Sequence, residues 1–83
     1  MAEVLVSERA ADWLSNAEPD VRDRIRKKLR EIEDFPGHYL ERLSGSALYR
    51  LRIGDYRAII DWDKEQELLR VRRIDKRDRI YDR

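Results

Sequence analysis

Apolar positions in the first part of the chain recur at helical intervals after one short apolar run. The run Val4-Leu5-Val6 predicts a strand, and Ser7 behind it is a typical helix N-cap. Ala10 is followed three and four residues later by Trp13 and Leu14, and Ala17 follows these at the same two spacings. This pattern predicts a helix of about three turns. The chain is therefore expected to begin with a strand followed directly by an amphipathic helix.

A second helix is predicted from Pro19 onward, because proline is favoured in the first turn of a helix. Most positions of this helix are charged, and its apolar stripe comprises Val21, Ile25, Leu29 and Ile32. The run Phe35-Pro36-Gly37 is expected to end it. The two helices are predicted to pack as an antiparallel pair with one buried face.

The second half of the chain changes to a period of two, which is typical of strands. After a predicted loop over residues 38–46, charged residues alternate with Tyr49, Leu51 and Ile53. Gly54-Asp55 predicts a two-residue hairpin turn with the glycine at positive φ, and the return strand covers residues 56–62. A polar turn at 63–66 leads to a third strand over 68–74 and a charged tail over 75–83.

These elements predict a single α+β domain over residues 1–83, with the element order β-α-α-β-β-β. The two-helix hairpin is expected to cover one face of a small, mainly antiparallel sheet. The other face of the sheet then carries the charged residues that alternate with the apolar ones.

The composition narrows the possible functions. The 83 residues include no cysteine and one histidine, His38, so neither a transition-metal site nor a cysteine nucleophile is expected. The chain has no glycine-rich phosphate loop and no apolar run long enough to span a bilayer. We therefore expect a cytoplasmic protein that uses no metal or other cofactor and does not associate with a membrane.

Arginines gather around the predicted hairpin. Arg50 and Arg52 project from the same face of one strand, and Arg57 lies directly across the turn from Arg52. Like charges that face each other destabilise a hairpin, so this cluster is expected to bind an anion, and planar guanidinium groups suit phosphate. The alternative is a salt-bridged surface, in which part of the charge is neutralised by Asp61, Glu67 or Asp75.

Three segments of the chain resemble the RelE/ParE toxin superfamily. They are Leu43-Ser44-Gly45, the run YRLRIGDYR over residues 49–57 and the run KRDRIY over residues 76–81. The order of the predicted elements matches that superfamily over nearly the whole chain. The resemblance implies the toxin of a type II toxin–antitoxin system, which a cognate RelB-like antitoxin wraps and silences.

Toxins of the RelE branch bind in the decoding site of the ribosome and cut the mRNA there, so the resemblance implies the ribosome and mRNA as partners. It implies a catalytic set of Arg50, Arg52, Arg57, Arg77 and Tyr81, and further RNA contacts from Arg42, Arg72, Lys76 and Arg79. RNA carries its own nucleophile, the 2′-hydroxyl. The expected activity is therefore a metal-independent endoribonuclease in which guanidinium groups stabilise the developing charge.

The chain departs from some members of the superfamily at two points. Arg50 and Arg52 stand where these members carry lysines, which keeps the charge but makes proton removal by either side chain difficult. Ser44 stands where some carry an arginine, which predicts one weaker RNA contact. In the implied set, Arg77 is our candidate for the side of the leaving oxygen, and Tyr81 for base stacking or proton transfer.

Two other interpretations stay open. A toxin of the ParE branch shares the fold but inhibits DNA gyrase through protein contacts, for which it does not need all five implied catalytic residues. A non-catalytic RNA- or antitoxin-binding module would keep the surface without cutting RNA. The nuclease interpretation fails if Arg50, Arg52 and Arg57 point away from each other, or if acidic neighbours neutralise them while Tyr81 lies remote.

Overall fold

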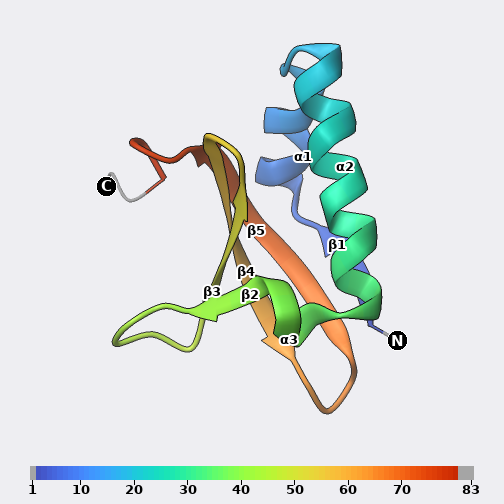
Figure 1. The fold of residues 1–83 in the computed structure, drawn as a ribbon, viewed down its shortest axis with the longest axis vertical. Helices are drawn as coiled ribbons and strands as arrows, with labels where there is room; N and C mark the ends of the chain where they lie inside the picture. Colours follow the sequence, from blue (N-terminus) through green and yellow to red (C-terminus); the bar gives the residue numbers. More distant parts are fainter. Residues whose placement is uncertain (1, 81–83) are drawn as a thin grey trace.

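The computed structural model describes residues 2–80 and contains a five-stranded sheet with the two long helices on one of its faces (Figure 1). The order across the sheet is β1-β5-β4-β3-β2. The strands are β1 (Glu3–Val6), β2 (Leu40–Arg42), β3 (Tyr49–Ile53), β4 (Tyr56–Asp63) and β5 (Leu68–Lys76). Neighbours from β2 to β5 are antiparallel, whereas β1 pairs with β5 in parallel. The predicted α+β class with a mainly antiparallel sheet is confirmed.

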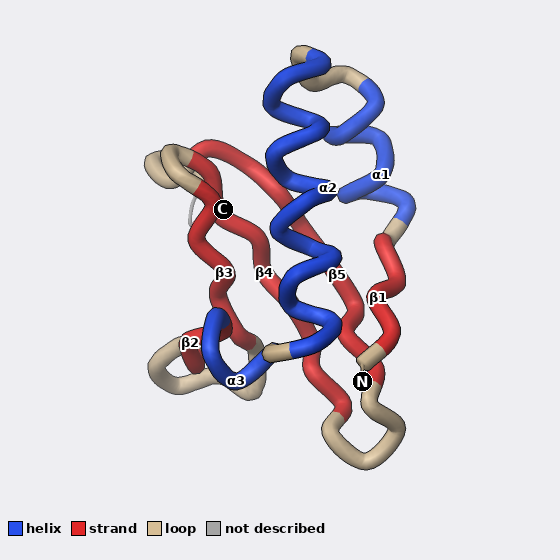
Figure 2. The backbone as a smooth tube through the Cα atoms, turned by 45° about the vertical axis from the view of Figure 1, so that its right-hand side comes forward, coloured by secondary structure: helices blue, strands red, loops and turns tan. Residues whose placement is uncertain are grey.

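The helices α1 (Glu8–Ser15) and α2 (Pro19–Asp34) form the predicted antiparallel pair and lie side by side (Figure 2). The N-cap at Ser7 is confirmed, because its hydroxyl oxygen accepts the backbone N–H of Ala10 at 3.1 Å. The same hydroxyl donates to the backbone carbonyl of Arg72 at 2.9 Å. One side chain thus starts α1 and ties it to β5.

The prediction of a loop over residues 38–46 was wrong in its first part. The short helix α3 (Pro36–Tyr39) is followed directly by β2, which pairs with β3 so that Glu41 lies opposite Arg50. Leu40 is buried and anchors this strand to the core. Three residues are too few to display a period of two, so the pattern along the chain did not reveal β2.

The hairpin between β3 and β4 follows the predicted register. Ile53 pairs with Tyr56 and Arg52 pairs with Arg57 across the turn, where Gly54 has φ 59°. Farther along, the pairing of β4 with β5 shifts between Ile59 and Ile60, which leaves an extra residue in β5. This bulge strengthens the local twist of the sheet.

The core lies between the helices and the inward face of the sheet. The helices contribute Ala10, Leu14, Ile25, Leu29 and Ile32, and the central strands contribute Leu51, Ile53, Ala58, Ile60, Leu69, Val71 and Ile74. No helix within residues 2–80 is long and apolar enough to cross a membrane. The helices leave the outward face of the sheet uncovered (Figures 1 and 2). Alternation along the strands places Arg50, Arg52 and Arg57 on that face.

Candidate anion-binding site on the open face of the sheet

The arginine pair of β3 lies on the open face because Arg50 and Arg52 alternate with the buried residues Leu51 and Ile53. Alternation of side chains along a strand therefore puts both guanidinium groups on the same side of the sheet, as predicted. The side chain of Arg50 is 28% exposed and that of Arg52 is 61% exposed. Arg50 is thus the more firmly packed member of the pair.

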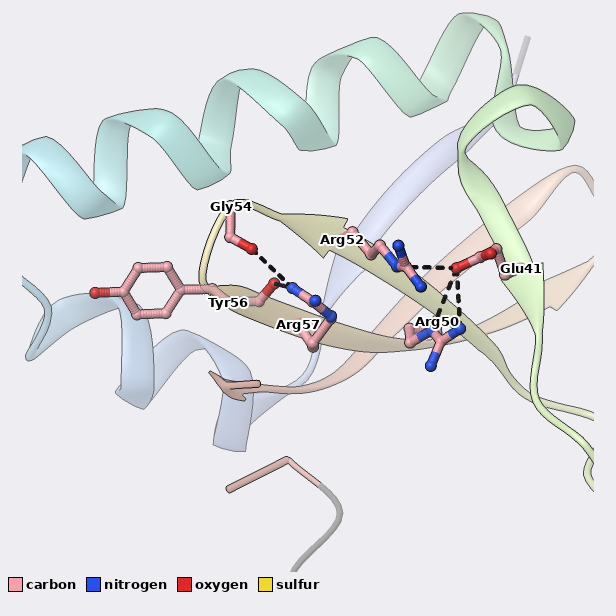
Figure 3. Close-up of polar contacts among 6 residues, drawn as sticks. All are labelled: Glu41, Arg50, Arg52, Gly54, Tyr56 and Arg57. Carbon is pink, nitrogen blue, oxygen red and sulfur yellow. Dashed lines mark hydrogen bonds and ion pairs between the residues drawn. The ribbon is translucent and has the colours of Figure 1, made fainter. Parts of the chain in front are cut away.

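Both guanidinium groups converge on one carboxylate oxygen of Glu41 (Figure 3). Oε1 of Glu41 lies 3.3 Å from Nε and 3.1 Å from Nη2 of Arg50. Nε of Arg52 lies 3.3 Å from the same oxygen. The three nitrogen atoms therefore surround a single anionic oxygen at the edge of the sheet.

The third arginine of the predicted cluster turns in a different direction. Nη1 of Arg57 donates to the backbone carbonyls of Gly54 and Tyr56, both at 2.8 Å (Figure 3). The expected meeting of all three guanidinium groups is therefore corrected to a pair that meets and a third that binds the hairpin turn. The two partner sets, a carboxylate and two carbonyls, relieve the repulsion between Arg52 and Arg57.

The acids that we considered as neutralising partners are engaged elsewhere. Asp61 pairs with Arg70 at 3.8 Å, and Asp75 pairs with Arg73 at 3.9 Å. Glu67 lies in the turn between β4 and β5, at the opposite end of β4 from the hairpin arginines. The carboxylate that neutralises Arg50 and Arg52 is that of Glu41.

The tail returns to the hairpin turn. The backbone N–H of Arg77 donates to the carbonyl of Asp55 at 2.8 Å, and Ile80 is buried. A hollow of about 450 Å³ at this end of the sheet is lined by Asp55, Tyr56, Lys76, Arg77 and Asp78. The backbone carbonyl of Arg79 accepts from Arg73 at 3.2 Å. Tyr81 lies outside the described residues.

Two of the predicted RNA contacts lie away from the arginine pair. Arg42 belongs to β2, and its Nε donates to the carbonyl of Ser46 at 3.3 Å. Its side chain borders a separate hollow of about 370 Å³ next to Tyr49 and Trp62. Arg72 borders a hollow at the opposite edge of the sheet, beside β1. The structure thus groups Lys76 and Arg77 with the hairpin but not Arg42 or Arg72.

Sequence reasoning missed two residues of this region. Glu41 was hidden in a strand of three residues, where only its place between Leu40 and Arg42 hinted at an outward direction. Arg24 of α2 reaches the hairpin turn, because its Nη1 lies 3.7 Å from the position that a Cβ of Gly54 would occupy. No spacing along the chain predicts that Arg24 lies near the hairpin turn.

The chemistry of the site follows from its charges. Two of the three guanidinium groups of the hairpin contact one carboxylate, that of Glu41. Two further acids lie nearby, since Asp55 is in the turn itself and Asp75 is opposite Arg57 in β5. A pair of guanidinium groups that surrounds one oxygen suits a non-bridging phosphate oxygen as well as a carboxylate. Within residues 2–80, no group of three or more His, Asp or Glu residues lies together in a way that could hold a metal ion.

Solved structures with the same fold are toxins of one superfamily and their complexes. The isolated RelE toxin of Escherichia coli has a TM-score of 0.77 and 22% identity, with 92% of this chain and 84% of that chain covered. A chain of the RelBE2 complex from Mycobacterium tuberculosis has a TM-score of 0.82 and 19% identity, with 92% and 98% covered. A chain of the RelE–RelB complex from Pyrococcus horikoshii has a TM-score of 0.80 and 21% identity, with 94% and 97% covered.

The fold is thus that of the RelE/ParE toxins, as the three motifs indicated. A family model described as the ParE toxin of the type II toxin–antitoxin system parDE matches residues 7–81. The chain therefore belongs to this family of toxins from type II toxin–antitoxin systems. No curated protein sequence shows significant similarity to it.

Proposed function

We propose that this toxin is a ribosome-dependent endoribonuclease that cuts mRNA in the decoding site and so inhibits translation. The observation that carries the proposal is the convergence of Arg50 and Arg52 on one anionic oxygen. Two guanidinium groups directed at one oxygen form the arrangement needed to stabilise charge that develops on a phosphate. Glu41 is an acidic neighbour and Arg57 points elsewhere, so the structure meets only part of the geometry expected for the nuclease. The proposal rests on the shared acceptor of Arg50 and Arg52.

The proposed reaction needs no nucleophile from the protein. The 2′-oxygen attacks the adjacent phosphorus, and the bond from phosphorus to the 5′-oxygen of the next nucleotide breaks. The products are a 2′,3′-cyclic phosphate and a 5′-hydroxyl, so the proton lost by the 2′-hydroxyl is balanced by one gained at the 5′-oxygen. Arg50 and Arg52 bind the non-bridging oxygens, and the ribosome aligns the attacking and leaving oxygens.

The remaining residues of the proposed catalytic set act around the hairpin tip. Arg57 exchanges its carbonyl partners for the RNA, while Arg77 stabilises the leaving 5′-oxygen. Support for the second assignment comes from the backbone bond between Arg77 and Asp55, which holds that part of the tail beside the turn. Tyr81 stacks on a base or assists proton transfer, because arginine stays protonated and serves poorly as a base.

Outer contacts and partners complete the proposal. Lys76 lines the hollow at the hairpin end and is proposed to bind the RNA backbone near the cut. More distant phosphates are assigned to Arg42, Arg72 and Arg79. We also propose a RelB-like antitoxin as partner, since solved structures with this fold include RelE–RelB complexes. The ribosome, mRNA and cytoplasm follow from the proposed reaction.

The test uses purified ribosomes that carry a defined mRNA with an open decoding site, and it maps cleavage by primer extension. The wild-type toxin should cut within the exposed codon. Arg52→Ala should lower the single-turnover rate by about 100-fold or more, as is typical for loss of one charge-stabilising donor. Arg70→Ala is the matched control, since Arg70 lies in β5 and pairs with Asp61. Absence of cleavage by the wild-type toxin would refute the nuclease.

The second candidate function is inhibition of DNA gyrase, which the match to the ParE family model favours. In this case the open face would contact protein, and the contact of Glu41 with Arg50 and Arg52 would be an ordinary surface ion pair. A supercoiling assay with purified gyrase separates the two functions. Inhibition of supercoiling without any cut in ribosome-bound mRNA would select the gyrase inhibitor.

A further inference from the structure

We propose that Glu41 occupies the phosphate position of the toxin and thereby determines which anions the arginine pair accepts. A carboxylate from within the chain keeps small anions out, and the RNA backbone displaces it. The inference deepens the proposed function and rests on it for the identity of the incoming anion. It makes Glu41 a specificity-determining residue of the arginine site.

The geometry shows how closely the carboxylate imitates a ligand. One oxygen, Oε1, makes all three contacts with Arg50 and Arg52, at 3.1 to 3.3 Å. Glu41 lies directly opposite Arg50 in the ladder between β2 and β3. The backbone pairing therefore delivers the carboxylate to the arginine pair without help from a flexible loop.

The ion pair between Glu41 and Arg52 is exposed and therefore weak. The side chain of Glu41 is 51% exposed, and that of Arg52 is 61% exposed. An ion pair at such exposure contributes between about 0 and 1 kcal/mol to stability, because water screens it and two long side chains lose freedom. A ligand that contacts further cations at the same time therefore displaces the carboxylate at little cost.

Competition with an internal anion selects for a polyanion. A group tethered to its site has an effective concentration in the millimolar range or above, and an incoming single anion must exceed it. An RNA strand contacts further cations, among them Lys76 and Arg77, and releases counterions from each neutralised phosphate. A free inorganic phosphate has neither advantage, so competition with Glu41 weakens its binding.

The experiment compares inorganic phosphate binding by the wild-type toxin and Glu41→Gln. The probe is the pair of Nε–H signals of Arg50 and Arg52 in two-dimensional NMR spectra, assigned by substitution of each arginine. A second titration uses a short single-stranded oligonucleotide with 2′-O-methyl groups, which cannot be cut, and fluorescence anisotropy. Glu65→Gln is the matched control, because it removes one exposed acid from the turn between β4 and β5.

We expect Glu41→Gln to bind phosphate about fivefold more tightly than the wild-type toxin, the factor that corresponds to an exposed ion pair at the upper end of its range, and the oligonucleotide by a smaller factor. Glu65→Gln should change either affinity by less than twofold. Glu41→Asp, whose carboxylate is one methylene shorter, should give an intermediate phosphate affinity. This second variant keeps the comparison usable if the glutamine variant is poorly folded.

Three results would overturn the inference. The first is an unchanged or weaker phosphate affinity in Glu41→Gln, and the second is an equal gain in Glu41→Gln and Glu65→Gln. The third is loss of mRNA cleavage in Glu41→Gln with unchanged phosphate affinity, which would assign Glu41 to the reaction itself. Failure of the wild-type toxin to cut mRNA refutes the proposed function but leaves the phosphate measurements interpretable.

Discussion

Arg52 and Arg57 face each other across the β3–β4 hairpin, yet their guanidinium groups bond in different directions. Arg52 contacts the carboxylate of Glu41, whereas Arg57 binds the carbonyls of Gly54 and Tyr56 (Figure 3). Two like charges in one cross-strand pair are unfavourable unless each finds its own acceptor. Each arginine of the pair thus has its own acceptor, and in the proposed function these acceptors are exchanged for phosphate oxygens.

Replacing Arg57 by alanine should destabilise the fold modestly. The substitution removes two hydrogen bonds to carbonyls of the turn, and partly solvated bonds of this kind contribute about 1 kcal/mol in total. Urea unfolding followed by circular dichroism measures the free energy of unfolding. Arg57→Lys keeps the charge but lacks the planar fork, and it should fall between wild type and alanine. If Arg57→Ala were more stable than wild type, repulsion with Arg52 would dominate over the turn contacts.

Gly54→Ala should lower the free energy of unfolding by about 1 to 2 kcal/mol. The residue has φ 59°, a conformation that costs this much for a residue with a Cβ. The space itself is adequate, since the nearest atom would be Arg24 Nη1 at 3.7 Å. Gly37→Ala is the control, because Gly37 lies in α3 at negative φ and its Cβ would contact only Trp62. Equal losses in both variants would show that strain at Gly54 is not the cause.

Ser7→Ala should cost about 1 kcal/mol or slightly more in stability. It removes the N-cap of α1 and also the bond that holds the carbonyl of Arg72 in the β5 bulge. Ser15→Ala, which loses one local bond to the carbonyl of Asp12, should cost less than about 0.5 kcal/mol. Thermal unfolding of the two variants side by side checks the difference. A Ser7 effect no larger than the Ser15 effect would contradict the dual role.

The salt dependence of RNA binding reports the phosphate contacts directly. For a non-cleavable single-stranded oligonucleotide, each lost phosphate contact lowers the slope of log K against log salt concentration by about 0.7. Arg52→Ala should show this reduction, whereas Arg70→Ala should keep the wild-type slope. A reduction of the same size in both variants would mean that the oligonucleotide follows overall charge and not the arginine pair.

The extent to which the sequence predicted this molecule depends on the length of each pattern. The stripe of α2 and the alternation of β3 extend over enough residues to identify both elements and the hairpin register. Leu40–Arg42 is too short for either period to appear, so the pattern predicts a loop where β2 lies. The predicted stop at Phe35-Pro36-Gly37 is confirmed because α2 ends at Asp34, but the pattern does not show that Pro36 also begins the short α3.

The sequence predicted which hairpin arginines share a face but not where their guanidinium groups point, and the catalytic and RNA-binding roles stay predictions. Alternation placed Arg50 and Arg52 on one face, since that follows from strand geometry alone. The direction of Arg57 depends on which acceptors it bonds, and its Nη1 bonds the carbonyls of the turn although Asp75 lies opposite it in β5. Glu41 could not be assigned because its role requires β2, the strand that the pattern did not reveal.

The measurement that tests the central claim most directly uses two mRNAs on identical ribosomes. One is all ribose, and the other carries a single 2′-deoxynucleotide at the position where the toxin cuts the first. We predict that the wild-type toxin cuts the ribose mRNA to give a 2′,3′-cyclic phosphate, and that it leaves the deoxy-substituted mRNA intact. Equal cutting of both, or no cutting of either, would contradict cleavage of RNA by its own 2′-hydroxyl at the arginine pair.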